Sequence, residues 1–182
     1  MNAGYLTIQE VVNTLDSLYK IRILNQEVQR EFIQLTEYYL SIQDSRLSLM
    51  LKYLIEEKKE YFIEGYRSIL MLLSYYDLKN ENSYHMMMLG MCVCLSHDYE
   101  IRSNRENGKR KSDIALKSKT KYPSFVIEFK YSKEEDNLER LAEAAIEQIK
   151  KKQYDEGLIG KVVYIGLAHH GKDVVIKWVE KD

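Results

Sequence analysis

The feature that most constrains the fold is a pair of strongly apolar segments separated by one amphipathic helix. SFVIEFKY at 124–131 and VVYIGLA at 162–168 both have the composition of buried strands. The intervening segment, 133–154, has a helical apolar period and a basic C-terminal end. Its apolar stripe consists of Leu138, Leu141, Ala145 and Ile149. A strand–helix–strand unit of this length predicts a right-handed parallel crossover, with the two strands adjacent in one sheet.

The elements around this unit extend it into a mixed α/β (α+β) domain. A helix that is capped by Asn80 and continues through SYHMMMLGMCVCLS is apolar nearly all round, so we expect it to be central and buried. Residues 99–104 and 112–118 predict an antiparallel pair of strands, and VVIKWV predicts a last strand after the turn HHGKD. The predicted order from residue 80 onward is α-β-β-β-α-β-β.

The first 79 residues have a different character. Residues 5–12 and 18–24 are β-rich segments separated by a polar turn, which predicts a hairpin. Apolar periodicity then predicts a helix that starts after Asn25 and two more at 45–57 and 60–76. We therefore divide the chain into a hairpin at 1–24, a helical region at 25–79 and a core domain at 80–182.

Composition restricts the class of protein. The 182 residues are 45% hydrophobic and 30% charged, as in soluble globular proteins. No secretory signal is recognisable, and the longest apolar run, 86–95, is about half of a bilayer span. The two cysteines, Cys92 and Cys94, fit neither a disulfide framework nor a common zinc motif. These features predict a cytoplasmic protein with buried, reduced thiols and no membrane association.

Charge is unevenly distributed along the chain. Residues 1–100 contain 9 basic and 14 acidic side chains, whereas residues 101–182 contain 18 and 14. Most of the basic excess lies in 102–121, which has only Glu106 and Asp113 as acidic residues. Its basic residues are Arg102, Arg105, Lys109, Arg110, Lys111, Lys117, Lys119 and Lys121. This segment indicates either a phosphate-bearing partner or a solvated loop, and both interpretations stay open from charge alone.

The strand at 124–131 carries an unusual pair of charges. Side chains alternate along a strand, so Glu128 and Lys130 share one face with Val126. Burying an unpaired carboxylate would cost several kcal/mol, and a divalent cation or another charged group removes that cost. Asp113, at the start of the preceding strand, can supply a second carboxylate, and the Phe129 carbonyl a further oxygen. Such oxygen donors suit Mg²⁺, for which Mn²⁺ can substitute.

These residues carry a family resemblance. Asp113, followed by Glu128-Phe129-Lys130 on an α-β-β-β-α-β scaffold, resembles the PD-(D/E)XK nuclease superfamily, which implies a restriction-endonuclease-like fold with a mixed sheet. ENSYHMMMLG, SNRENG, SDIAL, IEFK, AIEQIKKKQY and IGLA resemble in particular the nuclease-like domain found behind AAA-type ATPase modules. The resemblance covers roughly 80–182. GYLTI and the N-terminal hairpin resemble the tail of such an ATPase module, although the chain contains no Walker A motif.

The resemblance implies roles for individual residues. Asp113 and Glu128 would hold Mg²⁺, and Lys130 would act on the attacking water or on the scissile phosphate. Glu81 matches an additional acidic ligand of some members, and it also suits the first turn of a helix. The implied supporting residues are His85, Gln148 and Tyr154. One departure is Lys111, which stands where relatives often have an arginine that grips phosphate with two hydrogen bonds.

The sequence thus predicts a metal-dependent nuclease of low sequence specificity, with DNA favoured over RNA. The residues expected to contact nucleic acid are Arg102, Arg105, Lys109, Arg110 and Lys111, together with Lys150–Lys152. Two alternatives stay open: a catalytically idle module that binds nucleic acid or an AAA-type ATPase, and a helical adaptor in which Glu128 and Lys130 merely pair with each other. A homodimer is compatible with the sequence, which contains nothing that establishes it.

Overall fold

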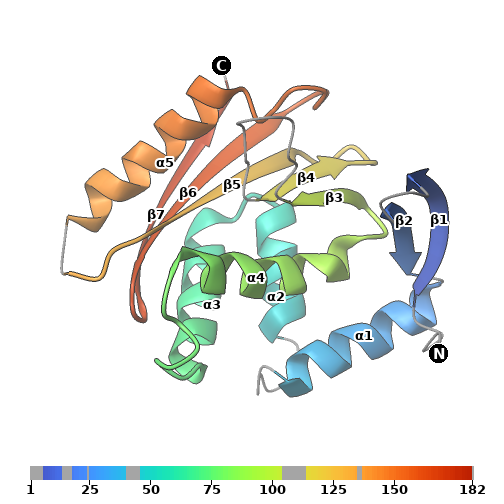
Figure 1. Cartoon of the computed structure of the whole chain (residues 1–182), viewed down its shortest axis with the longest axis horizontal. Helices are drawn as coiled ribbons and strands as arrows, with labels where there is room; N and C mark the ends of the chain where they lie inside the picture. Colours follow the sequence, from blue (N-terminus) through green and yellow to red (C-terminus); the bar gives the residue numbers. More distant parts are fainter. Residues whose placement is uncertain are drawn as a thin grey trace.

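The computed structural model of the chain describes residues 6–13, 18–23, 25–39, 46–103, 114–134 and 137–181. Its centre is a five-stranded mixed sheet in the order β3-β4-β5-β6-β7. One long helix, α5, covers one face of the sheet, and α2, α3 and α4 cover the other (Figure 1). The strands are β3 (Tyr99–Ser103), β4 (Ile114–Ser118), β5 (Ser124–Tyr131), β6 (Val162–His170) and β7 (Asp173–Glu180).

The predicted crossover is confirmed. β5 and β6 run parallel in a register that pairs Glu128 with Gly166, and α5 (Leu138–Lys152) connects them. The other neighbours, β3 with β4, β4 with β5 and β6 with β7, are antiparallel. The order from residue 80 onward is therefore the predicted one, apart from a short 3₁₀ helix, η1 (Val93–Leu95), that follows α4.

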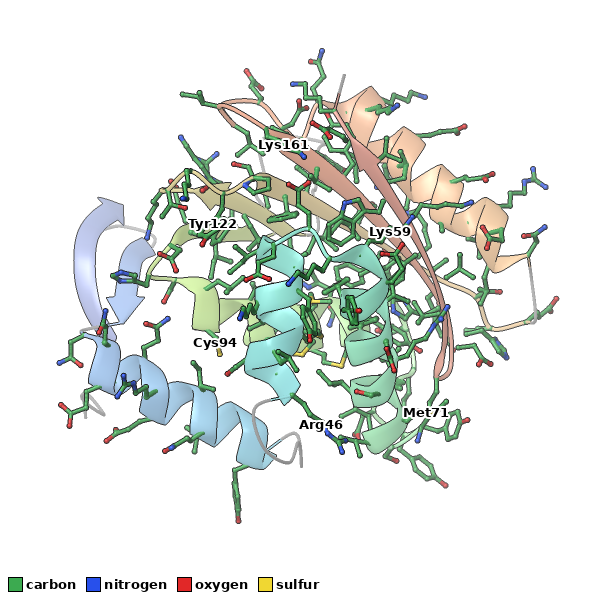
Figure 2. The ribbon with its side chains drawn as sticks, turned by 180° about the vertical axis from the view of Figure 1, so that it is seen from behind. Arg46, Lys59, Met71, Cys94, Tyr122 and Lys161 are labelled. Atoms are coloured by element: carbon green, nitrogen blue, oxygen red, sulfur yellow. The ribbon has the colours of Figure 1, made fainter. Side chains whose placement is uncertain are left out.

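The main core lies between the sheet and the three helices α2 (Arg46–Ile55), α3 (Lys59–Leu72) and α4 (Glu81–Cys92). Figure 2, which views the molecule from behind, shows α2 and α3 in front of the sheet. Phe125, Ile127 and Phe129 of β5 belong to the same apolar cluster as buried residues of these helices. The helical region at 46–72 therefore shares a core with the sheet, although the proposed division of the chain into domains stays a prediction.

The opposite face of the sheet has a smaller core beneath α5. Val126 of β5 packs there with Ile146 and Ile149 of α5 and with two residues of β6, Val162 and Tyr164. The alternation of side chains along β5 thus divides its residues between two cores, as the sequence predicts.

Close contact between α5 and β6 depends on Gly166. A Cβ atom at this position would lie 2.5 Å from the Ala142 carbonyl oxygen and 3.1 Å from the Ala145 Cβ. The absence of a side chain at Gly166 therefore lets the backbone of α5 approach the sheet at the position paired with Glu128.

The N-terminal elements are a hairpin and one helix, and Ile33 of that helix packs against the main core. β1 (Leu6–Asn13) and β2 (Leu18–Ile23) pair in an antiparallel hairpin, which confirms that prediction. In α1 (Gln26–Tyr39), the Asn25 side chain accepts a hydrogen bond from the Val28 amide, as expected of an N-cap. The Gln29 side chain donates to the Cys94 carbonyl at 2.5 Å, which attaches α1 to η1.

Two predictions about buried elements need correction. The first concerns the helix at 80–95, which is not fully buried. Only one side of α4 packs against the rest of the protein, and Met86 on its solvent side is 54% exposed. The second concerns HHGKD, which the sequence predicts as a turn. β6 continues to His170, so His169 lies in the sheet and is fully buried.

Two further observations concern the cysteines and the apolarity of the helices. Cys92 and Cys94 are both buried thiols, as predicted. Within the described ranges, no helix has the length and apolarity that crossing a bilayer requires.

Candidate active site

Glu128 is a buried carboxylate on the α5 side of the sheet. The residue is 1% exposed, and its Oε1 atom lies 3.2 Å from the Lys130 ammonium nitrogen. Strand alternation places both side chains on one face, and the Lys130 side chain is itself only 20% exposed. The sequence correctly predicts that these two charges converge in a largely buried place.

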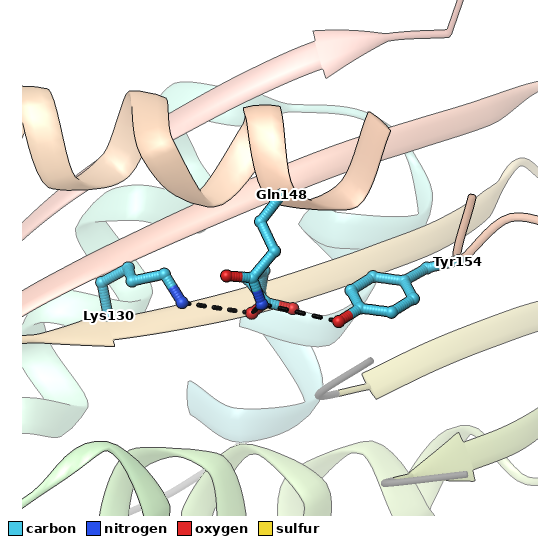
Figure 3. Close-up of polar contacts among 4 residues, drawn as sticks. Lys130, Gln148 and Tyr154 are labelled. Carbon is cyan, nitrogen blue, oxygen red and sulfur yellow. Dashed lines mark hydrogen bonds and ion pairs between the residues drawn. The ribbon is translucent and has the colours of Figure 1, made fainter. Parts of the chain in front are cut away.

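Gln148 and Tyr154 complete the described part of this cluster (Figure 3). The Gln148 side chain points from α5 toward β5, and its Nε2 atom donates a hydrogen bond to Oε1 of Glu128. The same Nε2 atom lies 3.5 Å from the Tyr154 hydroxyl oxygen. Oε1 thus accepts from both an ammonium and an amide, which offsets part of the cost of burying the charge. Gln148 and Tyr154 thus lie at Glu128, and their supporting role at a functional site stays a prediction.

The second predicted carboxylate lies outside the described residues. Asp113 immediately precedes Ile114, the first residue of β4. Ile114 pairs with Ile127, which immediately precedes Glu128. The described register therefore ends one residue before the two predicted metal ligands, and the role of Asp113 stays a prediction.

Glu81 and His85 come from the helix layer on the other face. Asn80 caps α4 by accepting from the Ser83 amide at 3.1 Å, and half-buried Glu81 begins the helix. His85 is 3% exposed; its Nε2 atom is 2.8 Å from the Ser103 hydroxyl, and its ring meets Phe129 edge-on. Since Glu128 points toward α5, these two residues belong to a different layer, and their roles at the site stay predictions.

The structure describes only part of the predicted nucleic-acid surface. Arg102, on β3, is half-buried and pairs with Glu100 at 3.2 Å. At the end of α5, Lys150 and Lys151 are exposed, and the Lys152 ammonium lies 5.4 Å from the Tyr154 ring centre. The remaining predicted contacts fall outside the described residues; they are Arg105, Lys109, Arg110 and Lys111.

Sequence reasoning missed the environment of His169. Its ring stacks on Tyr84 at 3.9 Å between centres, and its Nε2 atom lies 2.8 Å from the Tyr66 hydroxyl. Phe129, between Glu128 and Lys130 in the chain, stacks on its ring at 6.1 Å. Burial lowers the pKa of His169 to about 3, so the imidazole is neutral in the folded protein at neutral pH. The sequence, in which two consecutive histidines precede a glycine, contains no indication that His169 is buried.

This burial predicts an acid-sensitive contribution to stability. Below the ordinary histidine pKa of about 6.5, the unfolded chain gains a proton that the folded chain accepts only near pH 3. His169 should therefore lower the free energy of unfolding by about 2 kcal/mol between pH 7 and pH 5. Urea unfolding at both values measures this loss. His169→Gln should remove it and the exposed control His97→Gln should retain it, whereas equal losses in the two variants would contradict the assignment.

Comparison with known proteins agrees with this geometry. The mixed five-stranded sheet with its flanking helices is consistent with a restriction-endonuclease-like fold. The model of the PD-(D/E)XK nuclease superfamily matches residues 79–179, which is more than half of the chain. The chain therefore belongs to the PD-(D/E)XK nuclease superfamily, and its membership indicates a nuclease-type phosphodiesterase activity. Searches of curated proteins and of solved structures gave no match.

Members of this superfamily usually use divalent metal ions, and the donor chemistry of the site fits such an ion. Glu128 offers carboxylate oxygen, the type of ligand that Mg²⁺ prefers, and it is buried where an uncompensated charge would be costly. Among the described residues, no three histidine, cysteine, aspartate or glutamate side chains gather into a group that could hold a metal.

Proposed function

We propose that this chain is a Mg²⁺-dependent nuclease that hydrolyses phosphodiester bonds, with DNA favoured over RNA and with little sequence preference. The observation that carries the proposal is the buried Glu128 carboxylate, which holds both Lys130 and Gln148 in a chain of the PD-(D/E)XK superfamily. An ordinary surface ion pair is exposed to solvent and involves only its two charged side chains. The burial of Glu128 and its additional bond from Gln148 therefore favour a functional site.

Asp113 and Glu128 are the proposed metal ligands. The antiparallel register of β4 and β5 supports this pairing, because Ile114 and Ile127 are partners and are the chain neighbours of the two acids. One more residue of the same register would place the acids opposite each other on the α5 face. A divalent cation at this position would supply Lewis-acid activation of water and phosphate.

Lys130 has the proposed role of stabilising negative charge that grows on the scissile phosphate. Its ammonium group lies 3.2 Å from Glu128 and is only 20% exposed, which supports a role for it as a positioned positive charge. Gln148 fixes the orientation of the carboxylate by donating to Oε1. These two residues therefore hold Glu128 from two sides, one on β5 and the other on α5.

The basic segment at 102–111 and the exposed lysines at the end of α5 are proposed to contact backbone phosphates. Phosphate contacts are sensitive to salt and carry no sequence information, which supports the proposed weak sequence preference.

Glu81 is retained as a further proposed ligand. The origin of the hairpin as the tail of an ATPase module, association with an AAA-type ATPase, homodimer formation and cytoplasmic location are likewise proposals. Measuring the size of the protein with and without such an ATPase module tests the assembly.

The proposal is tested by incubating the purified chain with single- and double-stranded DNA and RNA. Cleavage should require Mg²⁺ or Mn²⁺, stop with a chelator, and be faster on DNA than on RNA. A chain that retards DNA in a gel but cleaves no substrate with either metal would instead be the idle binding module. Cleavage that persists in the chelator would contradict the metal requirement.

Replacement of Gln148 tests whether the helix contributes to the site. Gln148→Ala removes the amide donor to Glu128 and should lower kcat for DNA cleavage about 10- to 100-fold, as for residues that orient metal ligands. KM should change little, because Gln148 is proposed to orient Glu128 and not to bind the substrate. Initial rates over a range of DNA concentrations separate the two parameters.

The matched control is Glu147→Ala, which changes the adjacent but exposed residue of the same helix. It should leave both kcat and KM near the wild-type values. If the two variants lose activity equally, the effect arises from α5 as a whole and not from the bond between Gln148 and Glu128.

A further inference from the structure

Asp155 is a buried carboxylate that neither the metal site nor the main core accounts for. The residue is 8% exposed, and it forms an ion pair with the Lys181 ammonium. It also accepts a hydrogen bond from the Tyr164 hydroxyl. Burial alone would raise the pKa of Asp155, but the bonds from Lys181 and Tyr164 outweigh that effect and lower it. Asp155 is therefore ionised at neutral pH and held by Tyr164 of β6 and by Lys181, the residue that follows β7.

These bonds fix the segment that follows α5 to the sheet. The helix ends at Lys152, and Gln153 adopts a left-handed conformation with φ of 51°, which redirects the chain. Tyr164 lies within β6, while Lys181 follows β7 and donates its amide to the Val162 carbonyl at 2.9 Å. Both partners of Asp155 are thus anchored in the sheet, and Asp155 is anchored through them.

The residue next to Asp155 belongs to the proposed active site. The Tyr154 hydroxyl lies 3.5 Å from the Gln148 Nε2 atom, which donates to Glu128. The Tyr154 ring packs against the small apolar cluster beneath α5. A continuous series of contacts therefore connects Asp155, through Tyr154 and Gln148, to the buried carboxylate.

We propose that Asp155 is a positioning residue for the nuclease site: bonded to Lys181 and Tyr164, it holds Tyr154 beside Gln148 and thereby keeps the Gln148 amide on Glu128. This inference rests on the proposed function for its catalytic consequence. The positioning itself is a property of the fold that can be observed without substrate.

A second tether on the same helix provides a matched control. Near the start of α5, Glu139 and Glu143 lie 2.7 and 3.3 Å from the Lys177 ammonium of β7. This tether also joins α5 to the sheet, but it lies at the end of the helix away from Gln148. If attaching α5 anywhere were sufficient, breaking either tether would affect the site equally.

The test compares Asp155→Asn and Lys181→Met with the control Lys177→Met, using two measurements. The first follows the side-chain amide signals of Gln148 in ¹H–¹⁵N spectra, assigned by their absence in Gln148→Ala. Asp155→Asn and Lys181→Met should shift or broaden these signals, whereas Lys177→Met should not. Unmoved signals in both test variants would overturn the proposal, and Lys181→Met covers the case in which Asp155→Asn does not fold.

The second measurement is cleavage kinetics in a double-mutant cycle. Asp155→Asn should lower kcat about tenfold with KM within twofold of wild type, and it should cause no further loss when Gln148 is already alanine. An equal tenfold loss in both backgrounds would overturn the pathway through Gln148. If the wild type cleaves nothing while the amide signals respond as expected, the proposed function fails and the positioning contact stands.

Discussion

Glu128→Gln should abolish Mg²⁺-dependent cleavage, lowering kcat by at least about a hundred-fold while the protein still folds. Glutamine has nearly the same size and keeps an oxygen that can accept from Lys130 and Gln148, so the packing beneath α5 is retained. It lacks the negative charge that binds a divalent cation. Cleavage of a labelled DNA and urea unfolding, measured on the same preparation, separate these two effects.

Lys130→Met should cause a comparable loss of activity, because it removes the ammonium that lies 3.2 Å from Glu128 and keeps much of the aliphatic stem. The controls are Glu134→Gln and Lys133→Met, which make the same chemical changes at nearby exposed positions. Both controls should cleave at the wild-type rate. Full activity in Glu128→Gln and Lys130→Met would exclude this cluster as the active site.

The second large effect is expected at Gly166. Gly166→Ala places a Cβ atom 2.5 Å from the Ala142 carbonyl oxygen, a backbone atom, so α5 must move away from β6. We expect the free energy of unfolding to fall by about 2 to 3 kcal/mol, a typical cost of overpacking. Since Gly166 is the register partner of Glu128, this movement also withdraws Gln148 and should lower kcat about 10- to 100-fold.

Gly90→Ala is the matched control for this substitution. Gly90 lies in α4, and a Cβ atom there meets nothing within 4 Å. Alanine is the better helix former, so this variant should be as stable as the wild type or slightly more stable. Equal stability of Gly166→Ala and the wild type would show that α5 is not held as closely to β6 as the structure indicates.

Much of the fold could be predicted because its determinants are local in the sequence. The apolar runs at 124–131 and 162–168, with one amphipathic helix between them, allow few arrangements other than a parallel crossover. Strand alternation then places Glu128 and Lys130 together away from Phe129, as observed. Gly166 could also have been recognised, because an isolated glycine in an apolar strand often marks a close backbone approach.

The parts that could not be predicted depend on contacts between distant residues. Asp155 follows a basic helix end and looks like an ordinary turn residue, but its partner Lys181 is 26 residues away in the chain. His169 likewise becomes buried through contacts with residues far from it in the chain, among them Tyr66 and Tyr84 of two different helices. Met86 is as apolar as its buried neighbours in the sequence. It is exposed because α4 packs against the rest of the protein on one side only.

The most direct test is a crystal of the wild-type chain soaked in Mn²⁺ and measured at a wavelength where manganese scatters anomalously. Manganese substitutes for Mg²⁺, and its strong anomalous signal identifies the bound ion directly in the map. We predict a peak at roughly the 2.1 Å ligand distance typical of Mg²⁺ from a carboxylate oxygen of Glu128, with Asp113 as the second protein ligand, and no peak in Glu128→Gln. A map in which manganese binds elsewhere, or leaves Glu128 without a neighbouring peak at saturating concentration, would contradict the account.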